Sequence, residues 1–80
     1  MADGKDKAMA DMQALVATLK ERRIELGMSQ RELGARSGIG KNLVCAYETG
    51  RTASPTGLKL LAWADALGCD VVIAVRQDVT

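Results

Sequence analysis

Residues 29–50 have the sequence SQRELGARSGIGKNLVCAYETG, and this stretch predicts two short helices joined by a tight turn. The first helix begins at Ser29, whose hydroxyl is placed to accept a hydrogen bond from the backbone amide of Glu32. Glu32 completes a Ser-x-x-Glu capping box, because its carboxylate can accept from the Ser29 amide in return. Gly38 ends this helix, since glycine enters the left-handed region without a steric penalty, and Ile39 packs from the turn against the core.

The second helix of the pair is predicted over residues 41–49, with Gly40 before it and Gly50 after it. Its inward face contains Tyr47 together with Leu43 or Val44, and the assignment of Leu43 to the core or to the outward face stays open. The outward face carries small or polar side chains, namely Lys41, Asn42, Cys45 and Ala46. This layout is typical of a helix-turn-helix that docks on duplex DNA.

Two longer apolar patterns flank this pair. An amphipathic helix is predicted over residues 8–26, where apolar side chains recur at three- and four-residue steps and Gly27 follows. A strongly apolar helix ends at Gly68 and contains Leu58, Leu60, Leu61, Trp63, Ala64 and Leu67. Residues 1–7 are polar and are expected to form a flexible tail. The predicted DNA-binding domain therefore spans residues 8–68.

The composition favours one small, mainly α domain. The chain has 80 residues, and Trp63 and Tyr47 are its only aromatic side chains. The core must therefore be built largely from Leu, Val, Ile, Ala and Met, which suits small helices that pack closely. A domain of this size is near the limit at which one core suffices, so oligomerisation would add stability.

The net charge of +1 hides an uneven distribution along the chain. Residues 1–19 carry two Lys and three Asp, and residues 60–80 carry one Arg and three Asp. Residues 20–59 carry eight basic and four acidic side chains, a net charge of +4. This central excess matches the positive surface that a DNA-binding protein needs. An ordinary solvated surface is the alternative explanation.

The two cysteines, Cys45 and Cys69, indicate neither a metal site nor a disulfide framework. They lie 24 residues apart in a chain without histidine, which excludes the common zinc spacings. No nucleophile motif or phosphate-binding loop is present, so we expect no enzyme activity and no cofactor. No apolar run is long enough for a signal peptide or a membrane span, so we expect a cytoplasmic protein with reduced thiols.

The final segment, residues 69–80, departs from the helical pattern and is expected to hold a dimerisation strand and a tail. Residues 70–76 are rich in β-branched side chains, which predicts a strand. No second strand candidate exists in the chain, so we expect antiparallel pairing with the same strand of another copy across a two-fold axis. This dimer interface would contain Val71, Val72, Ile73, Ala74 and Val75. A fifth short helix or a disordered tail is the alternative.

A recognisable set of residues lies on the four predicted helices and in the turns between them. It consists of Leu19, Arg23, Gly27, Met28, Ser29, Gln30, Glu32, Leu33, Gly38, Ile39, Val44, Glu48, Gly50, Pro55, Leu60, Leu61, Ala64, Ala66, Leu67 and Gly68. Through these residues the chain resembles the lambda-repressor-like (Xre/Cro) helix-turn-helix domains. The resemblance implies a four-helix domain with a central helix-turn-helix, and the Val-rich strand resembles that of HipB-type antitoxins.

The resemblance also implies which residues contact DNA. Gln30 would contact phosphate and brace the recognition helix, while the first residues of that helix would face base edges in the major groove. The full set of implied contacts is Gln30, Arg31, Lys41, Asn42, Leu43, Cys45, Ala46, Arg51, Thr52 and Ser54. We expect few direct hydrogen bonds to bases, because Leu43, Cys45 and Ala46 occupy positions where many relatives have polar side chains. More of the discrimination between sequences would then come from DNA shape.

Two further residues in the resemblance, Arg23 and Glu48, imply a structural ion pair between the first and third helices. We expect this pair to stabilise the domain rather than to take part in chemistry. Cys45 is interpreted as a small side chain that allows close approach to DNA, and a redox-sensitive contact is the alternative.

Two functional hypotheses follow. The first is a homodimeric transcriptional regulator, a repressor that binds a palindromic operator in double-stranded DNA, and a phage Cro or immunity repressor falls within this class. The second is an antitoxin-type module that binds a toxin or another protein partner and autoregulates its operon. Either would be a cytoplasmic protein encoded by a bacterium or a phage.

Overall fold

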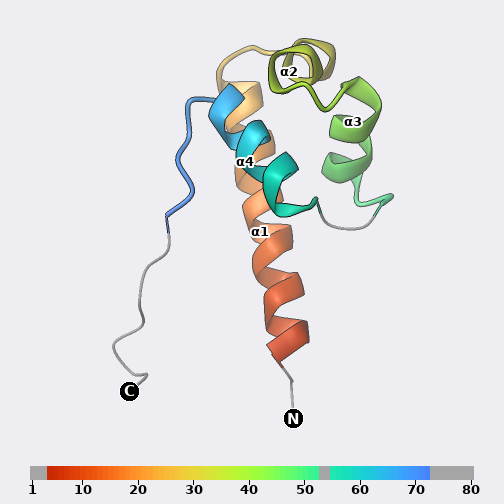
Figure 1. Cartoon of the computed structure of the whole chain (residues 1–80), viewed down its shortest axis with the longest axis vertical. Helices are drawn as coiled ribbons and strands as arrows, with labels where there is room; N and C mark the ends of the chain where they lie inside the picture. The colour runs from red at the N-terminus through yellow and green to blue at the C-terminus, as the bar shows by residue number, and fades with distance from the viewer. Residues whose placement is uncertain (1–3, 53–54, 73–80) are drawn as a thin grey trace.

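Four α-helices make up the part of the chain that the structure describes (Figure 1). This computed structural model describes residues 4–52 and 55–72. The helices are α1 (Gly4–Glu25), α2 (Gln30–Ser37), α3 (Lys41–Thr49) and α4 (Gly57–Ala66). The mainly α, four-helix architecture predicted from the sequence is therefore confirmed. Within the described residues, no helix combines the length and the apolar character needed to cross a membrane.

Helix α1 starts earlier than predicted. It begins at Gly4, whereas the sequence predicted a tail over residues 1–7 and a helix from residue 8. Asp6 lies in the first turn, where a negative charge favours the helix N-terminus. One turn later, Lys7 and Asp11 form an exposed ion pair with a distance of 2.7 Å. These local charges support a helical conformation in residues that are outside the core, so residues 4–7 extend α1 instead of forming a tail.

At its other end, α1 is followed by Gly27, as the sequence predicts. Gly27 has a φ of 67°, in the left-handed region. The backbone amide of Met28 donates to the carbonyl of Arg23 at 3.0 Å, which satisfies a carbonyl of the last helical turn. The chain thereby reverses into α2, and the Met28 side chain is buried in the core.

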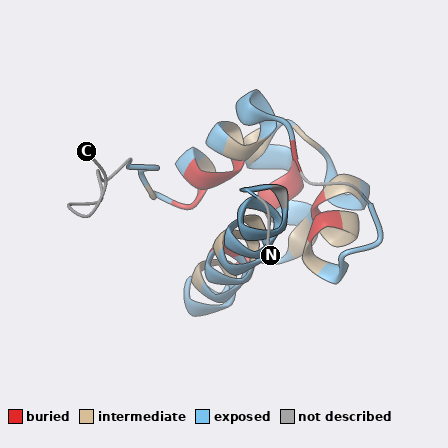
Figure 2. Ribbon diagram, turned by 90° about the horizontal axis from the view of Figure 1, so that it is seen from below, coloured by how far each residue is buried: buried red, intermediate tan, exposed pale blue. Residues whose placement is uncertain are grey.

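The hydrophobic core lies where the C-terminal half of α1 meets the other three helices (Figure 2). Its buried members are Leu19, Met28, Leu33, Val44, Tyr47, Trp63, Ala64 and Leu67. Both aromatic residues of the chain are among them, with ring centroids 5.8 Å apart and planes inclined by 23°. The core is thus aliphatic around one stacked aromatic pair, and it holds α3 against α4. The N-terminal half of α1 projects beyond it (Figure 1).

The C-terminal strand predicted over residues 70–76 is not present in residues 4–52 and 55–72. The described part, residues 70–72, has no regular secondary structure, and the Val72 side chain is 80% exposed. A strand needs a partner for its backbone amides and carbonyls, and the described part of this chain supplies no second strand. Of the predicted interface residues, Val71 and Val72 are therefore not in a strand, and Ile73, Ala74 and Val75 lie outside the described residues.

Candidate nucleic-acid interface

Helix α2 begins at the predicted cap. Ser29 has extended backbone angles, and its Oγ accepts a hydrogen bond from the Glu32 amide at 3.0 Å. This is one half of the predicted capping box. The Glu32 carboxylate accepts instead from Arg36 Nη2 at 3.2 Å, one turn further along α2. The cap satisfies an amide that would otherwise lack a partner at the helix start, so α2 begins at a defined point relative to α1.

Gly34 sets the close approach between α2 and the turn before α3, and the sequence analysis missed it. A Cβ at this position would lie within 3.0 Å of backbone atoms of Gly40 and Lys41. The Gly34 carbonyl accepts from the amides of Gly38 at 3.0 Å and Gly40 at 3.1 Å. A glycine in the middle of an eight-residue helix weakens that helix, so its presence was the signal of a close backbone approach.

Helix α3 is anchored to the core by its inward side chains. Val44 is fully buried and Tyr47 nearly so, and both pack in the cluster that contains Leu33 of α2. Leu43 is half-buried and packs against the same cluster while part of its side chain stays accessible. The sequence did not decide whether Leu43 belongs to the core or to the outer face, and in the structure Leu43 lies at the boundary between the two.

The side chains that the sequence proposed as DNA contacts lie on the outer face of α3 and on the segments beside it. Lys41 and Asn42 are exposed at the start of the helix, and Cys45 and Ala46 are half-buried one turn later. Arg31 is exposed on α2, Gln30 is half-buried at the start of α2, and Arg51 and Thr52 are exposed just after α3. Ser54 lies outside the described residues. The described members of the set therefore come from three consecutive segments, α2, α3 and the residues directly after α3.

The charges in residues 29–52 are arranged so that the positive ones remain available. Both acidic side chains in this range are paired, Glu32 with Arg36 at 3.2 Å and Glu48 with Arg23 of α1 at 2.7 Å. The other three basic side chains have no carboxylate partner within the described residues, and they are Arg31, Lys41 and Arg51. Uncompensated cations beside an exposed helix form a surface that attracts the phosphates of nucleic acid.

The pair formed by Arg23 and Glu48 joins α1 to the end of α3. Arg23 Nε donates to Glu48 Oε2 at 2.7 Å, and Arg23 Nη2 donates to Glu48 Oε1 at 3.0 Å. The third nitrogen, Nη1, donates to the Met28 carbonyl at 2.7 Å. The Glu48 side chain is 0% exposed and that of Arg23 is 13% exposed. The hydrogen bonds to Glu48 raise the pKa of Arg23, burial opposes this in part, and the Glu48 charge adds to the rise.

Gln30 connects the same carboxylate to α2. Its Nε2 donates to Glu48 Oε1 at 3.0 Å, so Oε1 accepts from both Arg23 and Gln30. One buried carboxylate therefore ties together the last turn of α1, the first turn of α2 and the last turn of α3. This arrangement fixes the direction of α3 relative to the rest of the domain, because bidentate Arg–carboxylate contacts are geometrically specific.

Arg51 lies across the end of α3 and is held there by uncharged partners. Its backbone amide donates to the Ala46 carbonyl at 3.0 Å, beside Gly50, whose φ of 74° ends the helix. Its Nε donates to Thr49 Oγ1 at 3.1 Å and its Nη2 to Cys45 Sγ at 3.3 Å. The guanidinium is thus oriented without being neutralised, and it covers the thiol on the outer face.

Comparison with known proteins agrees with this geometry. A family model described as Helix-turn-helix matches residues 19–73. The match contains α2, α3, α4 and the C-terminal part of α1, whereas residues 4–18 of α1 precede it. A search of the solved structures found no match.

Proposed function

This chain belongs to the helix-turn-helix family of DNA-binding transcription regulators, and on that premise we propose that it is a repressor that binds a palindromic operator as a homodimer. The observation that supports this proposal is the outer face of α3, whose exposed N-terminal turn is flanked by the three cations without carboxylate partners. In this arrangement α3 is the recognition helix, α2 lies across it, and the buried carboxylate of Glu48 sets the angle between them.

Base edges are contacted from the start of α3. Lys41 donates to guanine O6 or N7, and Asn42 forms paired hydrogen bonds with adenine, which are pairings that the major groove favours. The accessible part of Leu43 contacts a thymine methyl group. Cys45 and Ala46 are small enough to let the helix approach closely, so part of the selectivity comes from DNA shape rather than from hydrogen bonds.

Phosphates are contacted from both sides of the recognition helix. Arg31 and the backbone at Gln30 serve one side, and Arg51 with Thr52 and Ser54 serves the other. Because Arg51 is already oriented by Thr49 and Cys45, it loses little side-chain freedom on binding. These contacts supply affinity and register but little sequence information.

Dimerisation uses the apolar residues that α4 and the segment after it expose. Leu58 is 80% exposed and Leu61, one turn later, is 53% exposed. Val71 and Val72 are also exposed, and we propose that the strand predicted over residues 70–76 forms only when two copies meet. For both copies of α3 to enter successive major grooves, the two-fold axis has to hold them about 34 Å apart, which is one turn of DNA.

The test is selection of binding sites from a random duplex pool, followed by fluorescence anisotropy titrations. We expect palindromic sites whose half-site centres are about 10 base pairs apart. We expect a preference over scrambled duplex of about 10³-fold or more at physiological salt. Equal affinity for all duplexes at moderate salt would contradict the proposal. Repression is then measured as loss of transcription in vitro from a promoter that contains the selected site.

The antitoxin alternative is favoured by the same exposed leucines, because a protein partner would bury them as well as a second copy would. Light scattering of the purified chain separates the two hypotheses. A homodimer that binds the selected operator supports the repressor. A monomer that is isolated in a stoichiometric complex with the product of a neighbouring gene supports the antitoxin. The variants Leu58→Asp and Lys59→Asp each introduce one carboxylate at adjacent exposed residues of α4, and only the first, which interrupts the apolar surface, should abolish association.

A further inference from the structure

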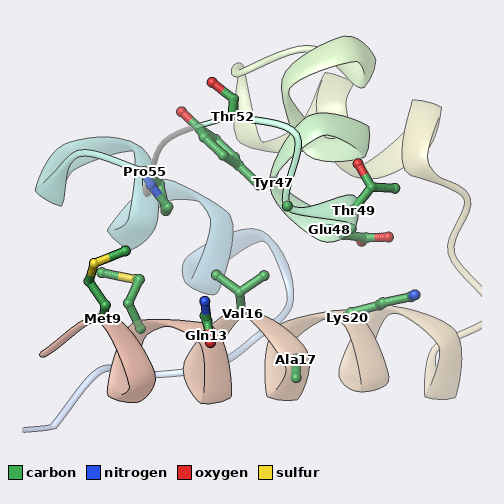
Figure 3. Close-up of a pocket in the computed structure, with 12 residues that line it drawn as sticks. Met9, Gln13, Val16, Ala17, Lys20, Tyr47, Glu48, Thr49, Thr52 and Pro55 are labelled. Carbon is green, nitrogen blue, oxygen red and sulfur yellow. The ribbon is translucent and has the colours of Figure 1, made fainter. Parts of the chain in front are cut away.

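A groove of about 480 Å³ lies between the N-terminal half of α1 and the end of α3 with the residues that follow it (Figure 3). Its size is within the range of small-molecule sites in proteins. One wall is formed by residues 9–20 of α1, and the other by residues 47–50 with Thr52 and Pro55. Most of the α1 wall, residues 9–17, precedes the family match, whereas Lys20 lies within it.

Apolar side chains line much of the groove. Met9 and Val16 line it from α1, and Tyr47 and Pro55 border it from the opposite side (Figure 3). Met12 also lines it from α1. Methionine side chains are flexible and polarizable, so they adapt to the shape of an apolar ligand. Met9 is 52% exposed, which leaves this wall in contact with solvent when the groove is empty.

The charge at the groove is positive. Two ionisable side chains of opposite sign line it, Lys20 and Glu48. The Glu48 carboxylate is buried and engaged by Arg23, so it does not attract a cation from the groove. Lys20 is exposed and has no carboxylate partner within residues 4–52 and 55–72. The chemistry that complements this lining is therefore a negative group next to Lys20 and an apolar body along Val16 and Met12.

Polar groups beside the apolar wall can orient such a ligand. Gln13 and Tyr47 line the groove, and neither the Gln13 amide nor the Tyr47 hydroxyl has a hydrogen-bond partner among the described residues. The groove thus combines an apolar wall with polar groups, and placed polar groups give small-molecule sites their specificity.

We propose that this groove binds a small organic carboxylate with an apolar body, and that the bound ligand weakens DNA binding. The carboxylate pairs with Lys20, and the apolar part runs along α1 past Val16 toward Met12. The second half of the proposal rests on the proposed function, since it requires that the chain bind DNA.

The coupling to DNA follows from the residues shared between the groove and the interface. Thr49, Gly50 and Thr52 line the groove, and Arg51 lies between them with its guanidinium anchored on Thr49 and Cys45. A ligand in the groove constrains the backbone that presents Arg51 and Thr52. Its carboxylate also neutralises Lys20, which lowers the attraction for DNA.

Ligand binding is tested without DNA, by amide chemical shifts of the full chain titrated with octanoate at millimolar concentrations. We expect shifts at residues 9–20 and 47–52. Octanamide, which lacks the charge, and acetate, which lacks the apolar body, should bind at least about tenfold more weakly. Lys20→Gln should weaken octanoate binding by a similar factor, and Lys59→Gln, which removes an exposed cation outside the groove, should not.

Several results would overturn the proposal. They are absence of saturable octanoate binding, equal binding of octanamide, and full octanoate affinity in Lys20→Gln. Shifts of the same residues with protein concentration alone would mean that a second copy fills the groove. With a selected operator, octanoate should raise the dissociation constant for DNA about fivefold, and DNA should weaken octanoate binding by the same factor. Failure of operator binding would refute the proposed function but leave the octanoate titration interpretable, whereas operator binding unaffected by bound octanoate would refute only the coupling.

Discussion

Arg23 on α1 holds the carboxylate of Glu48 on α3 through two hydrogen bonds of 2.7 Å and 3.0 Å, and the Glu48 side chain is completely buried. Gln30 donates to the same carboxylate at 3.0 Å. Helix α3 is therefore held by the two helices that precede it through one acidic side chain. The orientation of the outer face of α3 depends on this contact although none of the three side chains belongs to that face.

Glu48→Ala should lower the free energy of unfolding by about 3–5 kcal/mol, because it leaves the Arg23 guanidinium largely buried without its partner. The measurement is urea denaturation followed by the fluorescence of Trp63, the only tryptophan and a fully buried one. The matched control is Glu32→Ala, which breaks the exposed Glu32–Arg36 pair and should cost less than about 1 kcal/mol. Wild-type stability in Glu48→Ala would refute the role of the pair.

Gly34→Ala should destabilise the domain by about 1–3 kcal/mol or more, because the new Cβ overlaps the backbone of Gly40 and Lys41. The two helices must separate to admit it, so DNA affinity should also fall in the variant that remains folded. Gly57→Ala is the control, since its Cβ meets no atom within 4 Å and its φ is not positive. Equal thermal stability of the two variants would show that the close approach is not required.

Arg51→Gln should weaken binding to all duplexes by a similar factor. The slope of log affinity against log salt concentration should become shallower by about the contribution of one phosphate contact. The reason is that this guanidinium has only uncharged partners within the described residues. Anisotropy titrations at several salt concentrations measure the slope. Arg36→Gln is the comparison, because Arg36 is already paired with Glu32 and should change the slope less. Identical slopes for the two variants would argue against a phosphate contact at Arg51.

Asn42→Ala should relax selectivity at one position of each half-site. The free-energy preference for the preferred base over the other bases should fall there by about 1–3 kcal/mol. The measurement is a repeated site selection with the variant. Asn42 is exposed and has no side-chain hydrogen bond among the described residues, so thermal stability should stay unchanged. A uniform loss of affinity without a change in the selected sequence would mean that Asn42 contacts the backbone instead.

Cys45→Ala should preserve DNA binding, because the side chain serves as a small, half-buried part of the outer face. Cys45→Leu should weaken binding, since a larger side chain displaces Arg51 from the position where its Nη2 contacts the thiol at 3.3 Å. Gel shifts of both variants test this. Affinity of the wild type that falls after peroxide treatment, but not in Cys45→Ala, would instead support a redox-sensitive contact.

The boundaries of the central helices could be predicted because they depend on neighbouring residues. Ser29 caps α2 by accepting from an amide three residues later, and Gly38 and Gly50 end α2 and α3 with φ values of 79° and 74°. The start of α1 and the C-terminal segment could not be predicted in the same way. Exposed charges decide whether residues 4–7 are helical, and a strand over residues 70–76 needs a partner that the described part of a single chain does not supply.

The sequence by itself determined that this is a mainly α, helix-turn-helix protein, because caps, glycines and apolar spacing act over a few residues. Only the tertiary structure decided which charged groups remain available to a ligand. Arg23 and Glu48 are 25 residues apart, and their contact neutralises the carboxylate that lines the groove. Lys20 and Arg51 have no carboxylate partner within the described residues. Whether a cation is neutralised depends on its distance in space from a carboxylate, which no local sequence pattern encodes.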